Sequence, residues 1–203
     1  MFSGIVQEIG IVDKVEAWSG ISEIAISCNE IIKSIKPGDS VSVDGCCQTV
    51  VLKNDKSFSV QATDETLQKT TFQKLQKGSK VNLEDSLRLG DKICGHLVSG
   101  HVDASGAVSD ILSFAENQVI KISFPKKLSE YIAAKGSVSV NGVSLTVIDS
   151  KDGGFSFTLI PFTRDNTNLG NLKIGDHVNL EVDIISRYVV NYFNNNKALA
   201  GKV

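Results

Sequence analysis

The chain contains an internal repeat, and this repeat constrains its fold more than any other feature. The stretch GDSVSVDGCCQTVV around Cys47 returns as KGSVSVNGVSLTVI around Ser144, an offset of 97 residues (144 − 47). KVNLE, which begins at Lys80, returns as HVNLE, which begins at His177, at the same offset (177 − 80). Agreement between separated blocks in the same order indicates two homologous halves within one chain.

The N-terminal residues take part in the same repeat. FSGIVQEIGIV falls on VSGHVDASGAV at an offset of 96 residues (Gly100 − Gly4), so one residue is gained before the next matching block. We therefore predict a first domain at 1–95, a second domain at 96–183 and a C-terminal segment at 184–203.

Most of each half has the pattern of β-strands. SVSVDG and SVSVNG alternate apolar and polar residues and end in Asp-Gly or Asn-Gly, which favours a tight turn between antiparallel strands. Turn signals also precede FSVQA and FSFTL. Many short strands separated by turns predict an all-β fold in which each half is a barrel or a sandwich.

The C-terminal segment has a different pattern, that of an amphipathic helix. Its apolar residues recur at helical spacing. They are Ile185, Tyr188, Val189, Tyr192 and Phe193. The first half has no equivalent segment, and the pattern leaves two roles open: the helix covers the parent fold, or it contacts another subunit.

The composition excludes several classes of protein. The 203 residues carry a net charge of −2, which gives no reason to expect a nucleic acid or an anionic membrane as a partner. No apolar run approaches the roughly 20 residues that span a bilayer, and MFSGIVQEIG lacks the basic start of a signal peptide. The four cysteines have no extracellular spacing, so we expect reduced thiols and a cytoplasmic protein.

Cys46 and Cys47 are the first candidates for chemistry. Neighbouring residues of a strand point to opposite faces, so at most one of the two thiols can line a pocket. The repeat matches Cys46 to apolar Val143 and Cys47 to polar Ser144, which makes Cys47 the pocket candidate. A thiolate is a good nucleophile, whereas a buried cysteine is simply a small apolar side chain, and both roles are open for Cys47.

The stretch CGHLVSGH contains two of the three histidines. Cys94, His96 and His101 lie close together, but the spacing of the histidines on a strand aims them at opposite faces, so we predict no metal site. A structural role in a turn is the simpler interpretation of His96. The glycines around His101 let other groups approach the backbone closely, which favours a functional role for His101.

Four more polar residues are candidates for a pocket. Thr66 and Thr163 are repeat equivalents in expected loops, where threonines commonly cap or turn the chain. Ser40 opens a strand and Asp183 follows the last one, so capping and simple exposure are the plainer interpretations of these two. The sequence contains no phosphate-binding P-loop, nucleophile elbow or zinc-protease motif.

Eight motifs in order along the chain resemble the trimeric, two-barrel riboflavin synthase family. They are MFSGIVQEIG, DGCCQTV, DETL, VNLE, GHLVSGHV, NGVSLTV, LIPFT and TNLG. The resemblance implies two six-stranded antiparallel Greek-key barrels and a C-terminal helix that holds a homotrimer together. It also implies that two 6,7-dimethyl-8-ribityllumazine molecules dismutate to riboflavin and 5-amino-6-ribitylamino-pyrimidinedione, with no cofactor and no metal. Association with lumazine synthase is left open.

The resemblance further implies which residues hold the two substrates. The first pocket is expected to contain Gly4, Ile5, Val6, Cys47, Gln48, Thr49, Gln61, Ala62, Thr63, Asp64, Glu65 and Thr66. The second is expected to contain Gly100, His101, Val102, Lys135, Ser144, Leu145, Thr146, Leu159, Ile160, Pro161, Phe162 and Thr163. The expected catalytic residues are Ser40, Cys47 and His101, with Thr66 and Asp183 as further candidates.

Two departures and one rival accompany this resemblance. LEDSLR stands where the family usually has LERAL. Gln48 stands where leucine is common in the family, on the wall of the expected first pocket. The rival is a non-catalytic antenna protein of luminous bacteria that carries lumazine. Those proteins resemble the same fold, but they lack the GHLVSGH signature and are monomeric.

Overall fold

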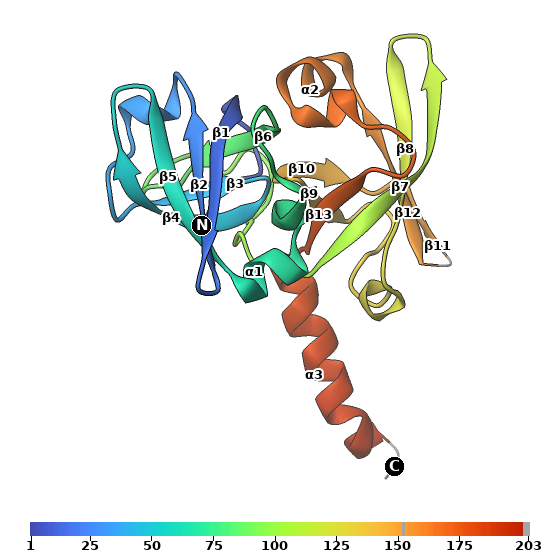
Figure 1. The fold of residues 1–203 in the computed structure, drawn as a ribbon. Helices are drawn as coiled ribbons and strands as arrows, with labels where there is room; N and C mark the ends of the chain where they lie inside the picture. Colours follow the sequence, from blue (N-terminus) through green and yellow to red (C-terminus); the bar gives the residue numbers. More distant parts are fainter. Residues whose placement is uncertain (152, 201–203) are drawn as a thin grey trace.

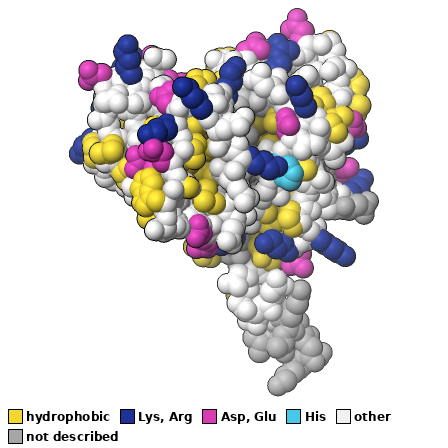
Figure 2. All heavy atoms as spheres, in the orientation of Figure 1, with side chains coloured by type: hydrophobic (Ala, Val, Ile, Leu, Met, Phe, Trp, Pro, Cys, Tyr) yellow, Lys and Arg dark blue, Asp and Glu magenta, His cyan; other side chains and the backbone are white. Residues whose placement is uncertain are grey.

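The computed structural model describes residues 1–151 and 153–200. Two β-structures lie side by side, and one long helix extends away from them at the C-terminal end (Figure 1). Charged side chains of both signs are spread over both β-structures on the face drawn in Figure 2. Among the described residues, no helix has the length and apolarity needed to cross a membrane.

The first repeat forms a closed six-stranded antiparallel barrel with the strand order β1-β2-β5-β4-β3-β6. Its strands are β1 (Glu8–Trp18), β2 (Ile21–Ser27), β3 (Ser40–Val43), β4 (Cys46–Lys53), β5 (Ser57–Thr63) and β6 (Lys80–Asp85). The alternating pattern of SVSVDG buries Val41 and Val43 in the barrel core. Asp44 and Gly45 both take positive φ, as a two-residue turn between antiparallel strands requires.

The second repeat forms a seven-stranded sheet with the order β10-β9-β13-β7-β8-β12-β11. Its strands are β7 (Ala104–Phe114), β8 (Asn117–Ser123), β9 (Ser137–Val140), β10 (Val143–Thr146), β11 (Asp149–Lys151), β12 (Gly154–Leu159) and β13 (His177–Val182). Its buried side chains form a core separate from that of the first barrel.

The seven strands follow the order of the first barrel, with the fourth strand in two pieces. β10 and β11 together match β4, which itself has an irregularity between Val50 and Leu52. The break between β10 and β11 falls at the equivalent place, where Ile148 N donates to Ser156 O of β12 at 2.8 Å. The predicted all-β fold of two homologous barrels plus a helix is therefore confirmed, with an interrupted ladder in the second barrel.

Short helices follow the fifth strand of each repeat. They are α1 (Asp64–Lys69) and α2 (Pro161–Asn166), and the four 3-10 turns are η1 (Ile31–Lys33), η2 (Thr71–Lys74), η3 (Lys126–Leu128) and η4 (Asn168–Asn171). Thr66 and Thr163 therefore lie in helical turns, and the prediction of loops was wrong there. The Thr63 hydroxyl caps α1 by accepting from Thr66 N at 3.4 Å.

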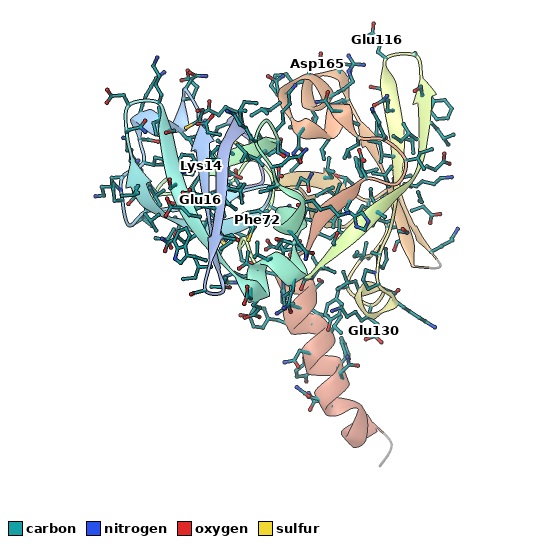
Figure 3. The ribbon with its side chains drawn as sticks, viewed as in Figure 1. Lys14, Glu16, Phe72, Glu116, Glu130 and Asp165 are labelled. Atoms are coloured by element: carbon teal, nitrogen blue, oxygen red, sulfur yellow. The ribbon has the colours of Figure 1, made fainter. Side chains whose placement is uncertain are left out.

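The C-terminal helix, α3 (Ile184–Ala200), is confirmed. The five side chains of its apolar stripe are 48% to 71% exposed, so the alternative in which this helix covers the barrels is wrong. Its flank does touch the second barrel, because Asn194 Nδ2 donates to Glu130 Oε2 at 3.3 Å. Figure 3 shows Glu130 beside α3.

The two barrels meet at their equivalent tight turns. Gly45 and Gly142 pack directly against each other: a Cβ on Gly45 would lie 2.5 Å from Gly142 N, and a Cβ on Gly142 would lie 2.8 Å from Gly45 N. Only glycine fits at such a contact, since these distances are shorter than any side chain tolerates. The repeat therefore produces an approximate twofold relation between the barrels.

Buried amides complete this junction. Asn82 Nδ2 donates to Asn141 O at 2.9 Å, and Asn179 Nδ2 donates to Asp44 O at 2.8 Å. The Asp44 carboxylate accepts from Asn82 N and from Asn168 Nδ2, both at 2.8 Å. Burial raises the pKa of Asp44 to about 7, although the hydrogen bonds from Asn82 and Asn168 act in the opposite direction.

Candidate active site

A pocket of about 280 Å³ lies on the first barrel beside α1. The residues that line it are Cys46, Cys47, Glu65, Thr66, Lys69, Thr70, Gly100, His101 and Val102. Three of the five expected catalytic residues, Cys47, Thr66 and His101, are thus brought together from β4, α1 and the segment before β7. This pocket is the candidate site for a small ligand.

The two neighbouring thiols of β4 differ in their surroundings. Cys46 is buried, and burial raises its pKa to about 12, with the donor Gln48 Nε2 acting in the opposite direction. Cys47 is only half-buried and shares the pocket with His101. A thiol must form the thiolate to react, so Cys46 is inert and Cys47 is the available nucleophile.

His101 reaches the first barrel from the second half of the chain. Cys47 N donates to Gly100 O at 2.8 Å, and Gly100 N donates to Glu181 Oε2 at 2.9 Å. Gly100 has a φ of +81°, and a Cβ there would lie 2.5 Å from Cys47 Cβ, so this position requires glycine. Val102 packs against the core of the first barrel.

The N-terminal segment makes the equivalent contacts with the second barrel. Ser144 N donates to Gly4 O at 2.7 Å, and Gly4 N donates to Glu84 Oε2 at 3.1 Å. Gly4 has a φ of +76°, and a Cβ there would lie 2.6 Å from Ser144 Cβ. Val6 packs against the core of the second barrel.

The expected grouping of these segments was therefore wrong. Residues 4–6 were expected beside Cys47, and residues 100–102 beside Ser144. In the structure, residues 4–6 lie beside Ser144 and residues 100–102 lie beside Cys47. The segments cross because they pair with each other at Phe2 and Val98, after which each runs along the opposite barrel before it enters its own. A repeat offset shows which residues are equivalent, but it does not show whether a residue contacts the first barrel or the second.

His96 belongs to the site of the second barrel and was missed as a functional candidate. Its Nδ1 lies 2.7 Å from Ser144 Oγ, and its buried Nε2 has no partner among the described residues. Burial lowers the pKa of His96, and the negative charge of Asp183 acts in the opposite direction. The repeat gave no signal for His96, because an offset of 96 places its equivalent before Met1.

Asp183 is near His96 and does not line the pocket that contains Cys47. Its carboxylate accepts from Ile185 N at 2.9 Å, and its carbonyl accepts from Ser186 Oγ at 2.6 Å. Asp183 thus caps α3 and also supplies a negative charge at the second site. Asp183 is half-buried, so simple exposure, its plainer interpretation, does not describe it, and capping α3 is compatible with its place near His96.

Two residues on the sheet next to Cys47 lie outside the lining of the pocket. Ser40 pairs with Thr49 across β3 and β4, two pairs along from Ser42 and Cys47, so it lies on the same face as Cys47. Gln48 is buried on the opposite face; its Nε2 donates to Cys47 O at 2.9 Å, and its Oε1 has no partner among the described residues.

The other residues expected in the first pocket lie along β5 and the start of α1. Ala62 is fully buried, and Gln61 Nε2 donates to Glu23 Oε2 at 3.2 Å. Thr63, Asp64 and Glu65 form the first turn of α1, which holds Thr66 and Glu65 at the edge of the pocket. Ile5 lies elsewhere, in a cavity with Glu84.

The residues expected in the second pocket follow the same plan. Leu145 and Leu159 are buried in the second core, whereas Ile160 and Phe162 are exposed at the start of α2. Of the other residues expected in this pocket, Thr146 lies at the end of β10, and Pro161 and Thr163 lie in α2. Lys135 is exposed with a φ of +69°, at the place where the first repeat has Gly38 (135 − 97).

Comparisons with known proteins agree with this architecture. The lumazine binding domain family matches the chain twice, at residues 3–86 and 99–183. The riboflavin synthase of Chlamydia trachomatis serovar D is 40% identical over 190 residues, which cover 94% of this chain and 93% of that protein. That of Actinobacillus pleuropneumoniae is 35% identical over 189 residues, with 93% and 88% covered.

Solved structures of the protein LumP are also similar. The LumP complex with riboflavin has a TM-score of 0.84 and 30% identity, and the complex with 6,7-dimethyl-8-(1'-D-ribityl) lumazine has a TM-score of 0.82 and 29% identity. Each comparison covers 90% of this chain and 99% of LumP. One lumazine binding domain per repeat, together with nearly full-length similarity to riboflavin synthases, shows that this chain belongs to the riboflavin synthase family.

Proposed function

We propose that this protein is an enzyme that converts two molecules of 6,7-dimethyl-8-ribityllumazine to riboflavin and 5-amino-6-ribitylamino-pyrimidinedione. The observation that carries the proposal is the duplicated pocket wall, in which Cys47 and Ser144 occupy equivalent strands and contact equivalent glycines. Two identical substrates call for two similar pockets. The change of sulfur to oxygen fits substrates that play unequal parts, one donating a four-carbon unit and the other accepting it.

The two pockets are proposed to meet between subunits of a homotrimer. The pocket that contains Cys47 and His101 on one subunit would face the site that contains Ser144 and His96 on its neighbour. The exposed apolar stripe of α3 supports this arrangement, because such a stripe stands clear of its own barrels and gains stability when another subunit covers it.

Positioning supplies most of the rate in this proposal. The methyl group at C7 of the lumazine is unusually acidic, so the protein needs no strong base. Holding two reactants in register is worth effective molarities of roughly 10⁵–10⁸ M, against roughly 10²–10⁴-fold for one acid or base. All atoms of the two substrates appear in the two products, so no oxidant, reductant or cofactor enters the balance.

Cys47 and His101 take specific parts in this scheme. The Cys47 thiolate adds to one lumazine, and the new C–S bond breaks again before the products leave, which regenerates the thiolate. Ser144 offers only a hydrogen bond to the other lumazine. His101, in the same pocket as Cys47, transfers protons to and from the bound lumazine. His96, which contacts Ser144 Oγ, orients that hydroxyl in the second pocket.

Incubation of the purified protein with 6,7-dimethyl-8-ribityllumazine alone tests this function. The expected result is the appearance of riboflavin absorption and green fluorescence with no other addition. Binding without turnover would instead favour a carrier of the LumP type, to which the structure is also similar. Absence of both binding and turnover would overturn the proposal.

A further inference from the structure

Arg187, in the first turns of α3, contacts the segment that carries His101. Its Nη1 lies 2.7 Å from Asp103 Oδ1, and its Nη2 donates to Asp103 Oδ2 at 2.9 Å. The same Nη2 donates to the His101 carbonyl at 3.3 Å. A bidentate arginine–carboxylate pair fixes direction as well as distance, so this contact holds the backbone of His101 in one orientation.

Asp103 is itself fixed, so the arginine is tied to a rigid element. Asp103 N donates to Leu180 O at 2.8 Å, and Asp103 Oδ2 accepts from Val182 N at 2.9 Å. The Asp103 side chain is only 13% exposed. Because two atoms of Asp103 bind β13, the pair with Arg187 connects α3, β13 and the His101 segment.

The repeat shows that this connection accompanies the histidine. At an offset of 96, His101 matches Ile5 and Asp103 matches Gln7. Gln7 makes the equivalent bond to the backbone of the first barrel without a charge, and no helix follows to supply an arginine. The carboxylate and the arginine are therefore found in the repeat that carries the imidazole. A general role in stability would instead favour the same pair in both repeats.

We propose that Arg187 is a positioning residue for His101, which rests on the function proposed above. On its N-terminal side His101 is held by Gly100, whose carbonyl accepts from Cys47 N. On its C-terminal side it is held by Asp103 and Arg187. Loss of the arginine frees the carbonyl of His101, so the imidazole shifts relative to Cys47, and small displacements of a catalytic group are costly. Because α3 also carries the proposed subunit contact, Arg187 links assembly to the geometry of the pocket.

The kinetic test uses Arg187→Gln, Arg187→Lys, His101→Gln and the double variant. Arg187→Gln is expected to lower kcat about tenfold, a fraction of what a positioned acid or base supplies, with lumazine affinity unchanged within about twofold. Arg187→Lys keeps the positive charge but cannot form the bidentate contact with a carboxylate, so its kcat is expected to lie between those of Arg187→Gln and the unaltered protein. In the His101→Gln background the arginine change is expected to have no further effect, because it acts through His101. Additive losses would overturn the proposal.

A second measurement is independent of turnover. Hydrogen exchange of the residues 99–103 is expected to accelerate about tenfold in Arg187→Gln, since Gly100 N and Asp103 N are protected by the bonds described above. Asn194→Ala, which removes only the contact of α3 with Glu130, serves as the matched control and is expected to leave both exchange and kcat unchanged. Unchanged exchange in Arg187→Gln would refute the positioning role even in a protein that makes no riboflavin.

Discussion

Cys47 and Ser144 are equivalent residues of the two repeats that differ in chemistry. Both begin from the same strand pattern, and both donate their backbone amide to a glycine carbonyl. The sulfur lies in a pocket with an imidazole, whereas the hydroxyl lies 2.7 Å from Nδ1 of the half-buried His96. The difference is one of reactivity, because both side chains are small enough to leave the same space for a ligand.

Substitution of Cys47 by serine tests this reading. We expect kcat to fall tenfold or more, because a hydroxyl is a much poorer nucleophile than a thiolate, while lumazine affinity changes by less than about threefold. Cys94→Ser is the matched control, since that thiol is exposed and lies outside the pocket. Activity of Cys47→Ser within twofold of the unaltered protein would reduce the thiol to a structural role.

At the scale of single residues the sequence predicted the pocket through the repeat. Cys47 and Thr66 were found because equivalent residues recur at a fixed offset, and His101 because glycines surround it. His96 was not found, since it has no equivalent in the first half. Its burial and its contact with Ser144 arise because the segments that pair at Phe2 and Val98 cross. A local sequence pattern cannot predict such a crossing.

Among the elements, the crossing segments and the paired turns determine how the barrels meet. Strand alternation and the Asp-Gly and Asn-Gly turns predicted the hairpins correctly. The short helices α1 and α2 were taken for loops, because six residues are too few to display a helical period. The division between β10 and β11 was also not predicted, since a break in a ladder depends on local geometry and leaves no pattern in the residues.

The crossing segment before β7 is expected to be intolerant of any added atom at Gly100. Gly100→Ala introduces a Cβ 2.5 Å from Cys47 Cβ at a φ of +81°, so both overpacking and backbone strain lower stability, by about 2–4 kcal/mol. Gly38→Ala is the control, because its φ of +93° brings the same strain with open space around the Cβ, and about 1–2 kcal/mol is expected there. Equal losses in urea unfolding would show that the contact with Cys47 contributes nothing.

The turn at Asp44 makes stability depend on pH. The folded pKa of about 7 lies above the value near 3.9 of an exposed aspartate, so the folded protein binds this proton more tightly than the unfolded chain. The contribution of Asp44 is therefore most favourable at low pH, and it is lost as the pH rises toward 7.

Asp44→Asn tests this dependence, since asparagine occupies the equivalent position 141. The free energy of unfolding of the variant, relative to that of the unaltered protein, is expected to rise by on the order of 2–3 kcal/mol from pH 5 to pH 8. Urea unfolding at the two pH values measures it. Exposed Asp55→Asn is the control and is expected to change stability equally at both. A gain for Asp44→Asn that is the same at pH 5 and pH 8 would contradict the assignment.

The whole molecule consists of two barrels that exchange their leading segments and a helix whose apolar stripe is left exposed. The duplication predicted two pockets, but it could not predict the exchange of residues 4–6 and 100–102. The repeat offset is the same whether each segment contacts its own barrel or the opposite one. The amphipathic pattern predicted α3, and the structure leaves its apolar stripe exposed instead of packing it on the barrels. In the proposed homotrimer, an active site combines the first pocket of one subunit with the second pocket of another.

Mixing two blocked variants tests whether the active site lies between subunits. Thr66→Phe obstructs the pocket of the first barrel, and Thr163→Phe makes the equivalent change (66 + 97) on the second. Each is expected to be nearly inactive alone. After unfolding and refolding as an equal mixture, about a quarter of the activity of the unaltered protein is expected, the share of interfaces that pair two intact pockets. A mixture as inactive as its components would contradict the account, because it would place both pockets of each active site on one chain.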